Sequence, residues 1–153
     1  MEKIIFLDID GVLNCSTTKS RLRSMVFVDE EKIELLADII KATDAKVVLT
    51  STWRLGALWP DAPALREDFN DLEIELNKHN VFISDVTKKL GDRGREISIW
   101  LKSHEECNYV ILDDDDFDIK EYALCKGHLV KTSWADGLTP DLAAQAIEML
   151  GRE

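Results

Sequence analysis

The sequence predicts a doubly wound α/β fold, in which a five-stranded parallel sheet carries helices on both faces. Short apolar runs rich in β-formers alternate along the chain with segments whose apolar residues recur every three or four positions. Acidic residues directly follow two of these runs, and a Thr-Ser pair ends another. Ligands of such sheets bind at the carboxyl ends of the strands, so the functional residues are expected there.

The first half of the chain contains three expected strands and two helices. Residues 4–7 are an apolar run that ends at an acidic turn, as in a buried parallel strand. Asp29 is a suitable N-cap for a helix with apolar residues at helical spacing, and residues 46–50 form the next strand. After a proline-containing loop, residues 65–76 carry one apolar helical stripe, and residues 81–83 are a short third strand.

The second half completes the pattern. Residues 97–101 mark a third helix, and residues 109–112 form the fourth strand. Residues 117–125 are expected to be helical, and residues 129–132 form the fifth strand. The last helix begins at Thr139, followed by proline, and ends near a glycine. Five strands alternating with five helices predict a Rossmann-like three-layer sandwich.

Length and composition are consistent with one domain over residues 1–153. Hydrophobic residues make up 45% of the chain and no repeat recurs, which excludes disordered and low-complexity classes. No apolar run approaches the roughly 18 residues of a membrane span, so no membrane association is expected. The net charge of −11 disfavours a surface that coats nucleic acid.

The spacing of the cysteines and the short apolar N-terminus favour a cytoplasmic location. The spacing of the cysteines and histidines gives little support to a zinc site. Cys15, Cys107 and Cys125 are an odd number without metal-ligand spacing, which is typical of a reducing compartment. The three histidines are isolated in sequence. Four apolar residues at the N-terminus are too few for a secretory segment of about 7–15.

Carboxylates from two strands are expected to meet at one edge of the sheet. The first strand ends in Asp8-Ile9-Asp10 and the fourth in a run of acids that begins at Asp113. Without a cation such a cluster would be strongly repulsive, and its oxygen ligands suit Mg²⁺. The alternative is that turns simply favour aspartate.

The order of these motifs resembles the haloacid-dehalogenase-like (HAD) superfamily of phosphohydrolases. Some longer strings look like a small-domain HAD group, some members of which accompany RNA-repair enzymes. The motifs that carry the resemblance are Asp8-Ile9-Asp10-Gly11-Val12, Thr50, Arg93 or Arg95, and Asp113-Asp114.

This resemblance implies a role for each motif. Asp8 would be the nucleophile that forms an aspartyl-phosphate, and Asp10 the general acid and base. Thr50 would donate a hydrogen bond to the phosphoryl oxygens, although it could equally be an ordinary hydroxyl at a strand end. Arg93 is favoured over Arg95 as the catalytic cation, because an apolar helix position follows Arg93 by four residues. Arg95 is then a substrate-binding candidate or a solvent-facing residue.

The implied cofactor is Mg²⁺. Its ligands would be Asp8, Asp10 (through the carbonyl oxygen), Asp113 and Asp114. Asp118 falls at the spacing of a further acid of the family, either as a ligand or behind the ligands.

Residues after the second strand are candidates for substrate binding. Ser51 and Arg54 could contact a phosphate, although Arg54 could instead form a surface ion pair. Trp53 and Trp59 could stack on a base or be buried, and Trp134 could line the rim of the site.

Residues 15–29 are too few for a cap domain and are expected to form a hairpin flap. An open site would admit a large substrate, and Lys19, Arg21 and Arg23 could contact its phosphates or be solvated. The leading hypothesis is a Mg²⁺-dependent phosphomonoesterase acting on a phosphorylated small molecule or a nucleic-acid end. A polynucleotide 3′-phosphatase or nucleotidase is the alternative, and a non-catalytic Mg²⁺- or phosphate-binding module is a second one. No obligate protein partner is inferred.

Overall fold

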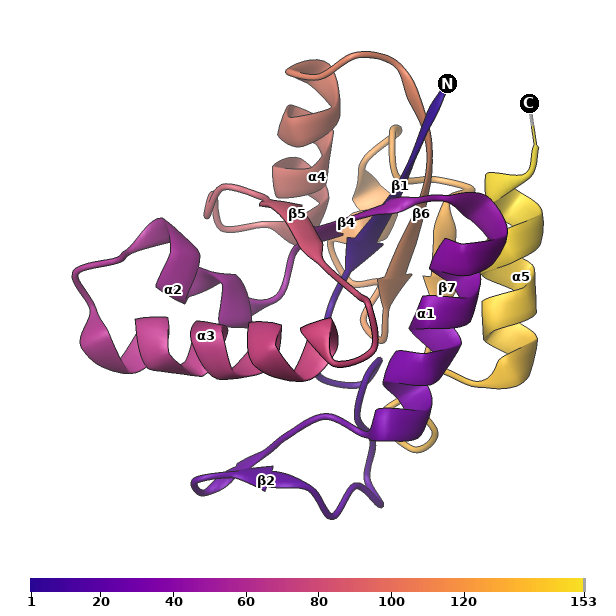
Figure 1. Ribbon diagram of the computed structural model, residues 1–153. Helices are drawn as coiled ribbons and strands as arrows, with labels where there is room; N and C mark the ends of the chain where they lie inside the picture. The colour runs from indigo at the N-terminus through magenta and orange to yellow at the C-terminus, as the bar shows by residue number, and fades with distance from the viewer. Residues whose placement is uncertain (153) are drawn as a thin grey trace.

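The computed structural model describes residues 1–152, and these form a five-stranded parallel sheet in the order β5-β4-β1-β6-β7. Helices cover both faces, so the predicted α/β sandwich is confirmed (Figure 1). The strands are β1 (Glu2–Leu7), β4 (Lys46–Leu49), β5 (Ile83–Val86), β6 (Cys107–Asp113) and β7 (Leu129–Lys131). The helices are α1 (Glu30–Thr43), α2 (Leu55–Leu58), α3 (Pro63–Asn77), α4 (Arg93–Lys102) and α5 (Pro140–Leu150).

The side chains of the central strand β1 divide the core in two. Ile5 and Leu7 belong to the larger cluster, which α1, α3 and α5 complete. Ile4 and Phe6 belong to the smaller cluster, which includes Trp100 of α4. Successive side chains of a strand point to opposite faces, so one apolar run serves both layers. No helix among residues 1–152 is long and apolar enough to cross a membrane.

Two predicted elements are wrong in part. The predicted helix at 117–125 contains only the single 3-10 turn η2 (Ile119–Glu121). The Asp115 carboxylate accepts a hydrogen bond from the N–H of Phe117, and such local bonds compete with helix formation. The third strand is β5 rather than 81–83, because the N–H of Val81 bonds the carbonyl of Leu76 and closes the end of α3.

Two short elements were not predicted, and one cap differs from expectation. The chain after β4 forms the 3-10 turn η1 (Thr52–Arg54) and then the single-turn helix α2. Asp29 occupies the N-cap position of α1, but its side chain makes no capping bond. Its carboxylate instead accepts a hydrogen bond from the Thr18 hydroxyl.

Residues 15–29 contain a hairpin of β2 (Arg21–Leu22) and β3 (Met25–Val26), which extends beyond the carboxyl ends of the sheet strands (Figure 1). Arg23 at its tip forms ion pairs with three acids of α3: Glu67, Asp68 and Asp71. These contacts fix the hairpin against α3 at the edge where the functional residues were expected.

Candidate active site

Three carboxylates converge at the carboxyl ends of β1 and β6. Asp8 follows β1, Asp113 ends β6, and Asp114 follows it. One oxygen from each of these side chains lies within 4.8 Å of the others. This is a donor set of hard oxygens, which suits Mg²⁺.

Gly11 allows the two acidic segments to approach one another. A Cβ atom at Gly11 would lie 2.1 Å from Oδ2 of Asp114, and the backbone there has a φ of +84°. Both the space and the left-handed conformation therefore require glycine.

The electrostatics of the cluster favour a bound cation. Burial raises the pKa of Asp8 to about 7, the charge of Asp113 adds to the rise, and Arg93 opposes it. Burial and Asp113 also raise the pKa of Asp114. Ionisation of Asp8 and Asp114 is thus costly until positive charge compensates it.

Arg93, the first residue of α4, supplies one such charge. Its Nη1 lies 2.7 Å from Oδ2 of Asp113 and 3.3 Å from Oδ1 of Asp8. Arg95, two residues later, is exposed and does not line the pocket. The structure therefore brings Arg93, and not Arg95, to the carboxylates.

Asp118 holds the start of α4 in place. Its two carboxylate oxygens accept hydrogen bonds from the backbone N–H groups of Arg93 at 3.1 Å and Gly94 at 2.9 Å. An acceptor at a helix N-terminus satisfies free donors there and is favoured by the helix dipole. Asp118 thus lines the pocket while positioning Arg93.

Asp10 lies apart from the three clustered carboxylates and faces solvent. Its carboxylate accepts hydrogen bonds from Nδ2 of Asn14 at 2.9 Å and Nε1 of Trp53 at 3.3 Å. Sequence reasoning had not identified Asn14, and had considered Trp53 only as a stacking or buried residue. These two donors fix the Asp10 carboxylate, which lines the same cavity as the clustered acids.

Thr50 and Ser51 end β4 and are both buried. The Thr50 hydroxyl has no hydrogen-bond partner among the described residues. A buried polar atom without a partner is costly, but Thr50 is not among the residues that line the cavity described below. The Ser51 hydroxyl instead accepts from the backbone N–H of Trp53, and Thr52, which had not been selected, lines the pocket.

Arg54 is only 3% exposed, and so the predicted alternative of a surface ion pair is wrong. Its guanidinium donates to four backbone carbonyls and pairs with Glu96 at 3.0 Å. These contacts use all five of its N–H donors. Arg54 thus ties the end of β4 to the loop before α4. It also lines the cavity of the site, and its contact with a substrate phosphate stays a prediction.

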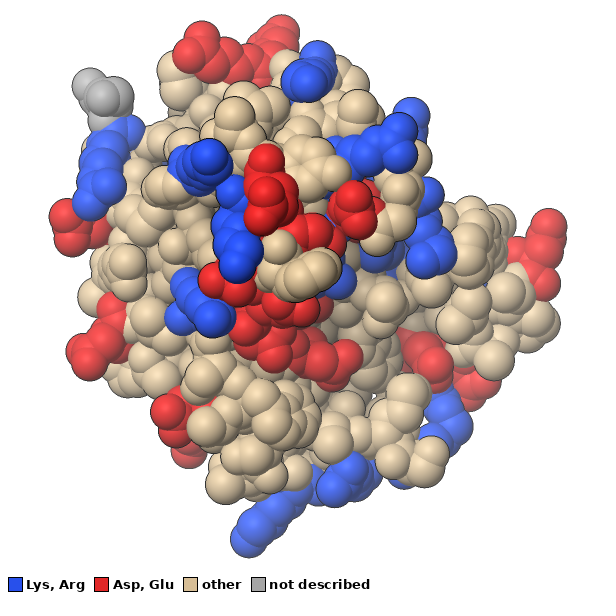
Figure 2. All heavy atoms as spheres, turned by 180° about the vertical axis from the view of Figure 1, so that it is seen from behind, with Lys and Arg blue, Asp and Glu red and all other residues tan. Residues whose placement is uncertain are grey.

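The site is a polar cavity of about 380 Å³. Most of the residues that line it are acidic, and three basic residues, Arg54, Lys89 and Arg93, also line it. Figure 2 shows Asp and Glu side chains gathered in the middle of one face, flanked by Lys and Arg. The remaining lining residues are Asp8, Asp10, Thr52, Gly91, Glu96, Asp113, Asp114, Asp115 and Asp118.

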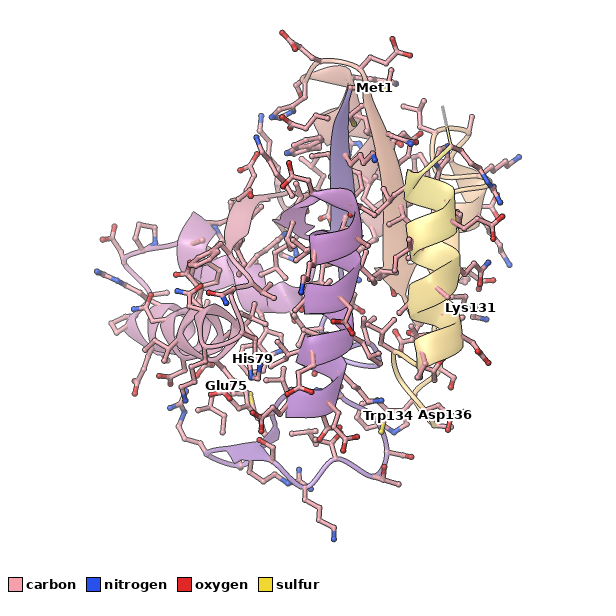
Figure 3. The ribbon with its side chains drawn as sticks, turned by 45° about the vertical axis from the view of Figure 1, so that its right-hand side comes forward. Met1, Glu75, His79, Lys131, Trp134 and Asp136 are labelled. Carbon is pink, nitrogen blue, oxygen red and sulfur yellow. The ribbon has the colours of Figure 1, made fainter. Side chains whose placement is uncertain are left out.

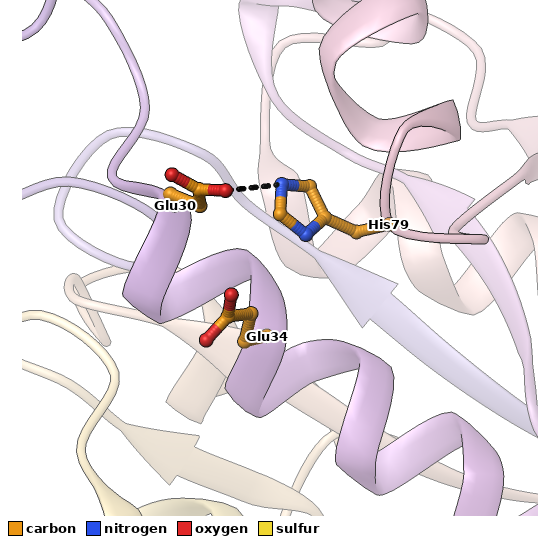
Figure 4. A group of neighbouring side chains, drawn as sticks. All are labelled: Glu30, Glu34 and His79. Carbon is orange, nitrogen blue, oxygen red and sulfur yellow. Dashed lines mark ion pairs between the residues drawn. The ribbon is translucent and has the colours of Figure 1, made fainter.

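A second group of possible metal ligands lies away from this cavity. His79 lies near Glu30 and Glu34 of α1, and its Nε2 is 3.6 Å from Glu30 (Figure 4). His79 therefore has carboxylates near it in space, although the histidines are isolated from one another in the sequence. The two glutamates are exposed, and the arrangement is that of a surface ion pair.

Comparisons with known proteins found one matching family and a solved structure of similar fold. Residues 4–143 match the family described as HAD domain in Swiss Army Knife RNA repair proteins. No curated protein matches the chain. The fold is similar to that of D,D-heptose 1,7-bisphosphate phosphatase from B. bronchiseptica, crystallised with magnesium and phosphate. That structure has a TM-score of 0.64 and 17% identity, with 98% of each chain covered.

Proposed function

Because the chain belongs to the family of HAD domains in Swiss Army Knife RNA repair proteins, we propose that it is a Mg²⁺-dependent phosphomonoesterase that acts through Asp8. The observation that carries this proposal is the position of the Asp8 carboxylate, which lies between two acids and the guanidinium of Arg93. A heptose bisphosphate phosphatase of the same fold was crystallised with magnesium and phosphate.

The residues present fit a magnesium ion. Asp8, Asp113 and Asp114 supply carboxylate oxygens close together, and burial, with the charge of Asp113, raises the pKa of Asp8. The backbone carbonyl of Asp10 would complete the protein ligands. A magnesium ion bound here would neutralise the carboxylates and draw in the phosphate group.

The chain's own residues then divide the reaction between them. An Oδ atom of Asp8 attacks phosphorus, the bond to the leaving oxygen breaks, and an aspartyl-phosphate forms. Asp10 donates a proton to the leaving oxygen and afterwards takes one from the water that hydrolyses the intermediate. Arg93 and the Thr50 hydroxyl stabilise charge on the phosphoryl oxygens.

The test is hydrolysis of p-nitrophenyl phosphate with Mg²⁺ or with EDTA. We expect activity to need Mg²⁺ and to disappear in Asp8→Asn. Asp116→Asn is the matched control, because Asp116 lies in the same acidic loop but pairs with Lys131 outside the cavity. Full turnover in Asp8→Asn, or in EDTA, would refute the mechanism.

A second variant separates the two roles open to Asp10. Asp10→Asn should slow phosphoenzyme formation or breakdown while Mg²⁺ binding is largely kept, since its carboxylate is bonded to Asn14 and Trp53. Calorimetry of Mg²⁺ binding measures this directly. Loss of Mg²⁺ affinity would instead make the Asp10 carboxylate a ligand.

A nucleic-acid-end phosphatase is the alternative function, and the family description favours it. The hairpin contributes exposed Lys19 and Arg21, whereas Arg23 is paired with α3. Side-by-side assay of nucleotides, sugar phosphates, phosphopeptides and 3′-phosphorylated oligonucleotides tests it. Preference for oligonucleotides, weakened by Ala at Lys19 and Arg21, would support this alternative.

A further inference from the structure

A second cavity, of about 400 Å³, adjoins the catalytic pocket, and the two cavities share Asp10 and Thr52. We call this cavity the leaving-group groove. Apart from Asp10, Thr52 and Asp68, its lining is apolar: Met25, Val26, Trp53, Leu55, Leu65 and Trp134. Its volume is within the range of about 300–1,000 Å³ that is usual for small-molecule sites.

Large apolar side chains of this groove face solvent. Trp134 is 46% exposed and Met25 is 37% exposed. They approach the groove from different segments, the loop after β7 and the hairpin strand β3. An apolar surface assembled in this way at the edge of a catalytic pocket is typical of a ligand site.

The walls of the groove are held in place before any ligand binds. The carbonyl of Trp134 accepts a hydrogen bond of 2.7 Å from the N–H of Ser16, at the base of the hairpin. Lys32 donates to the carbonyl of Asp136 in the same loop. Figure 3 shows Trp134 at the opposite end of the molecule from Met1, where the sheet strands end. The indole is thus presented on a fixed backbone.

The chemistry of Asp10 determines what lies in the groove. In the proposed reaction Asp10 protonates the leaving oxygen, so the organic part of the substrate must lie beside Asp10. Asp10 and Trp134 both line the groove. The leaving group would therefore contact an apolar, aromatic surface.

We propose that the leaving-group groove binds a nucleobase of the phosphorylated substrate, stacked on Trp134; this rests on the function proposed above. A base is flat, aromatic and uncharged, and base stacking on aromatic side chains needs no specific hydrogen bonds. A sugar phosphate would need several polar partners, but Asp68, the polar residue not shared with the catalytic pocket, is paired with Arg23. The base could belong to a free nucleotide or to a nucleic-acid end.

The first experiment measures binding rather than turnover. Asp8→Asn protein with Mg²⁺ is titrated calorimetrically with adenosine 3′- and 5′-monophosphate and with glycerol phosphate. We expect at least one nucleotide to bind more tightly than glycerol phosphate. Trp134→Ala should weaken nucleotide binding by about tenfold relative to glycerol phosphate. Trp59→Ala is the matched control, because Trp59 is similarly exposed (45%) but lies outside the groove.

Equal binding of nucleotides and glycerol phosphate, or equal loss of both in Trp134→Ala, would overturn the proposal. Tight binding of a phosphotyrosine peptide without nucleotide binding would also overturn it. A short 3′-phosphorylated oligonucleotide distinguishes the sources, since a nucleic-acid end should bind more tightly than the mononucleotide. If nucleotide binding depends on Trp134 but no phosphatase activity is found, the proposed function is refuted and the proposed base-binding role of the groove is supported. If Asp8-dependent activity is found but Trp134→Ala leaves nucleotide binding unchanged, only the proposed role of the groove is refuted.

Discussion

Replacing Asp8 by Asn is expected to stabilise the metal-free protein at neutral pH. In the folded protein burial and Asp113 raise the pKa of Asp8 from 3.8 to about 7. Between these values the folded state binds more protons than the unfolded state, so the free energy of unfolding falls as pH rises. The stability that protonated Asp8 confers is complete below about pH 4 and is lost as pH rises through 7. Asparagine does not ionise and avoids this loss.

The size of the effect follows from the shift. About three pKa units at 1.36 kcal/mol each give at most about 4 kcal/mol. The attraction of Arg93, which lowers the pKa of Asp8, is already included in this shift. The difference between the two proteins should therefore grow with pH to a few kcal/mol.

The assay is urea unfolding in EDTA at intervals from pH 4.5 to 8. The parent protein, Asp8→Asn and the control Asp116→Asn are compared, with the free energy of unfolding extrapolated to water. Saturating Mg²⁺ should then stabilise the parent protein more than Asp8→Asn, because the ion binds the folded carboxylate cluster. A difference between parent and Asp8→Asn that does not change with pH would refute the raised pKa that burial and Asp113 give to Asp8.

Three further substitutions test other parts of the structure. Gly11→Ala places a methyl group against Asp114 and should lower Mg²⁺ affinity by roughly 10- to 100-fold, as measured by calorimetry; unchanged affinity would contradict the close approach. Arg54→Met leaves the Glu96 charge buried and four carbonyls without a donor, and should cost about 3–5 kcal/mol in urea unfolding. A second change, Glu96→Gln, should restore only the part that comes from the buried charge. Arg23→Ala should cost less than about 1 kcal/mol, because the pairs are exposed. It should nevertheless speed hydrogen exchange in the hairpin, and unchanged exchange would mean that other contacts hold it.

The core strands were predictable because a strand that is buried on both faces is a continuous apolar run in the sequence. Residues 4–7, 47–49 and 109–112 lie in β1, β4 and β6 and form continuous apolar runs. The edge strand β5 is less apolar, and its start was placed two residues early. The helix expected at 117–125 failed because aspartate side chains there bond backbone N–H groups, including those of α4.

The sequence predicted which residues belong to the candidate site, but not which of them contact one another. The order of motifs pointed to Asp8, Asp113 and Asp114, which the fold brings together. Nothing local distinguishes Arg54 from Arg93, since both are arginines near a strand end or a helix start. Arg54 is buried and bonds backbone carbonyls, whereas Arg93 faces the carboxylates.

The sequence by itself determined the layered α/β architecture and the presence of acids at the strand ends. Both depend on residue order, because apolar periodicity and turn chemistry act over a few positions. Only the tertiary structure decided which cation meets the acids, how Asp10 is held and that an apolar groove adjoins it. The walls of the groove come from the hairpin, η1, α2, α3 and the loop after β7. Such contacts between distant segments depend on packing, which short-range sequence patterns do not encode.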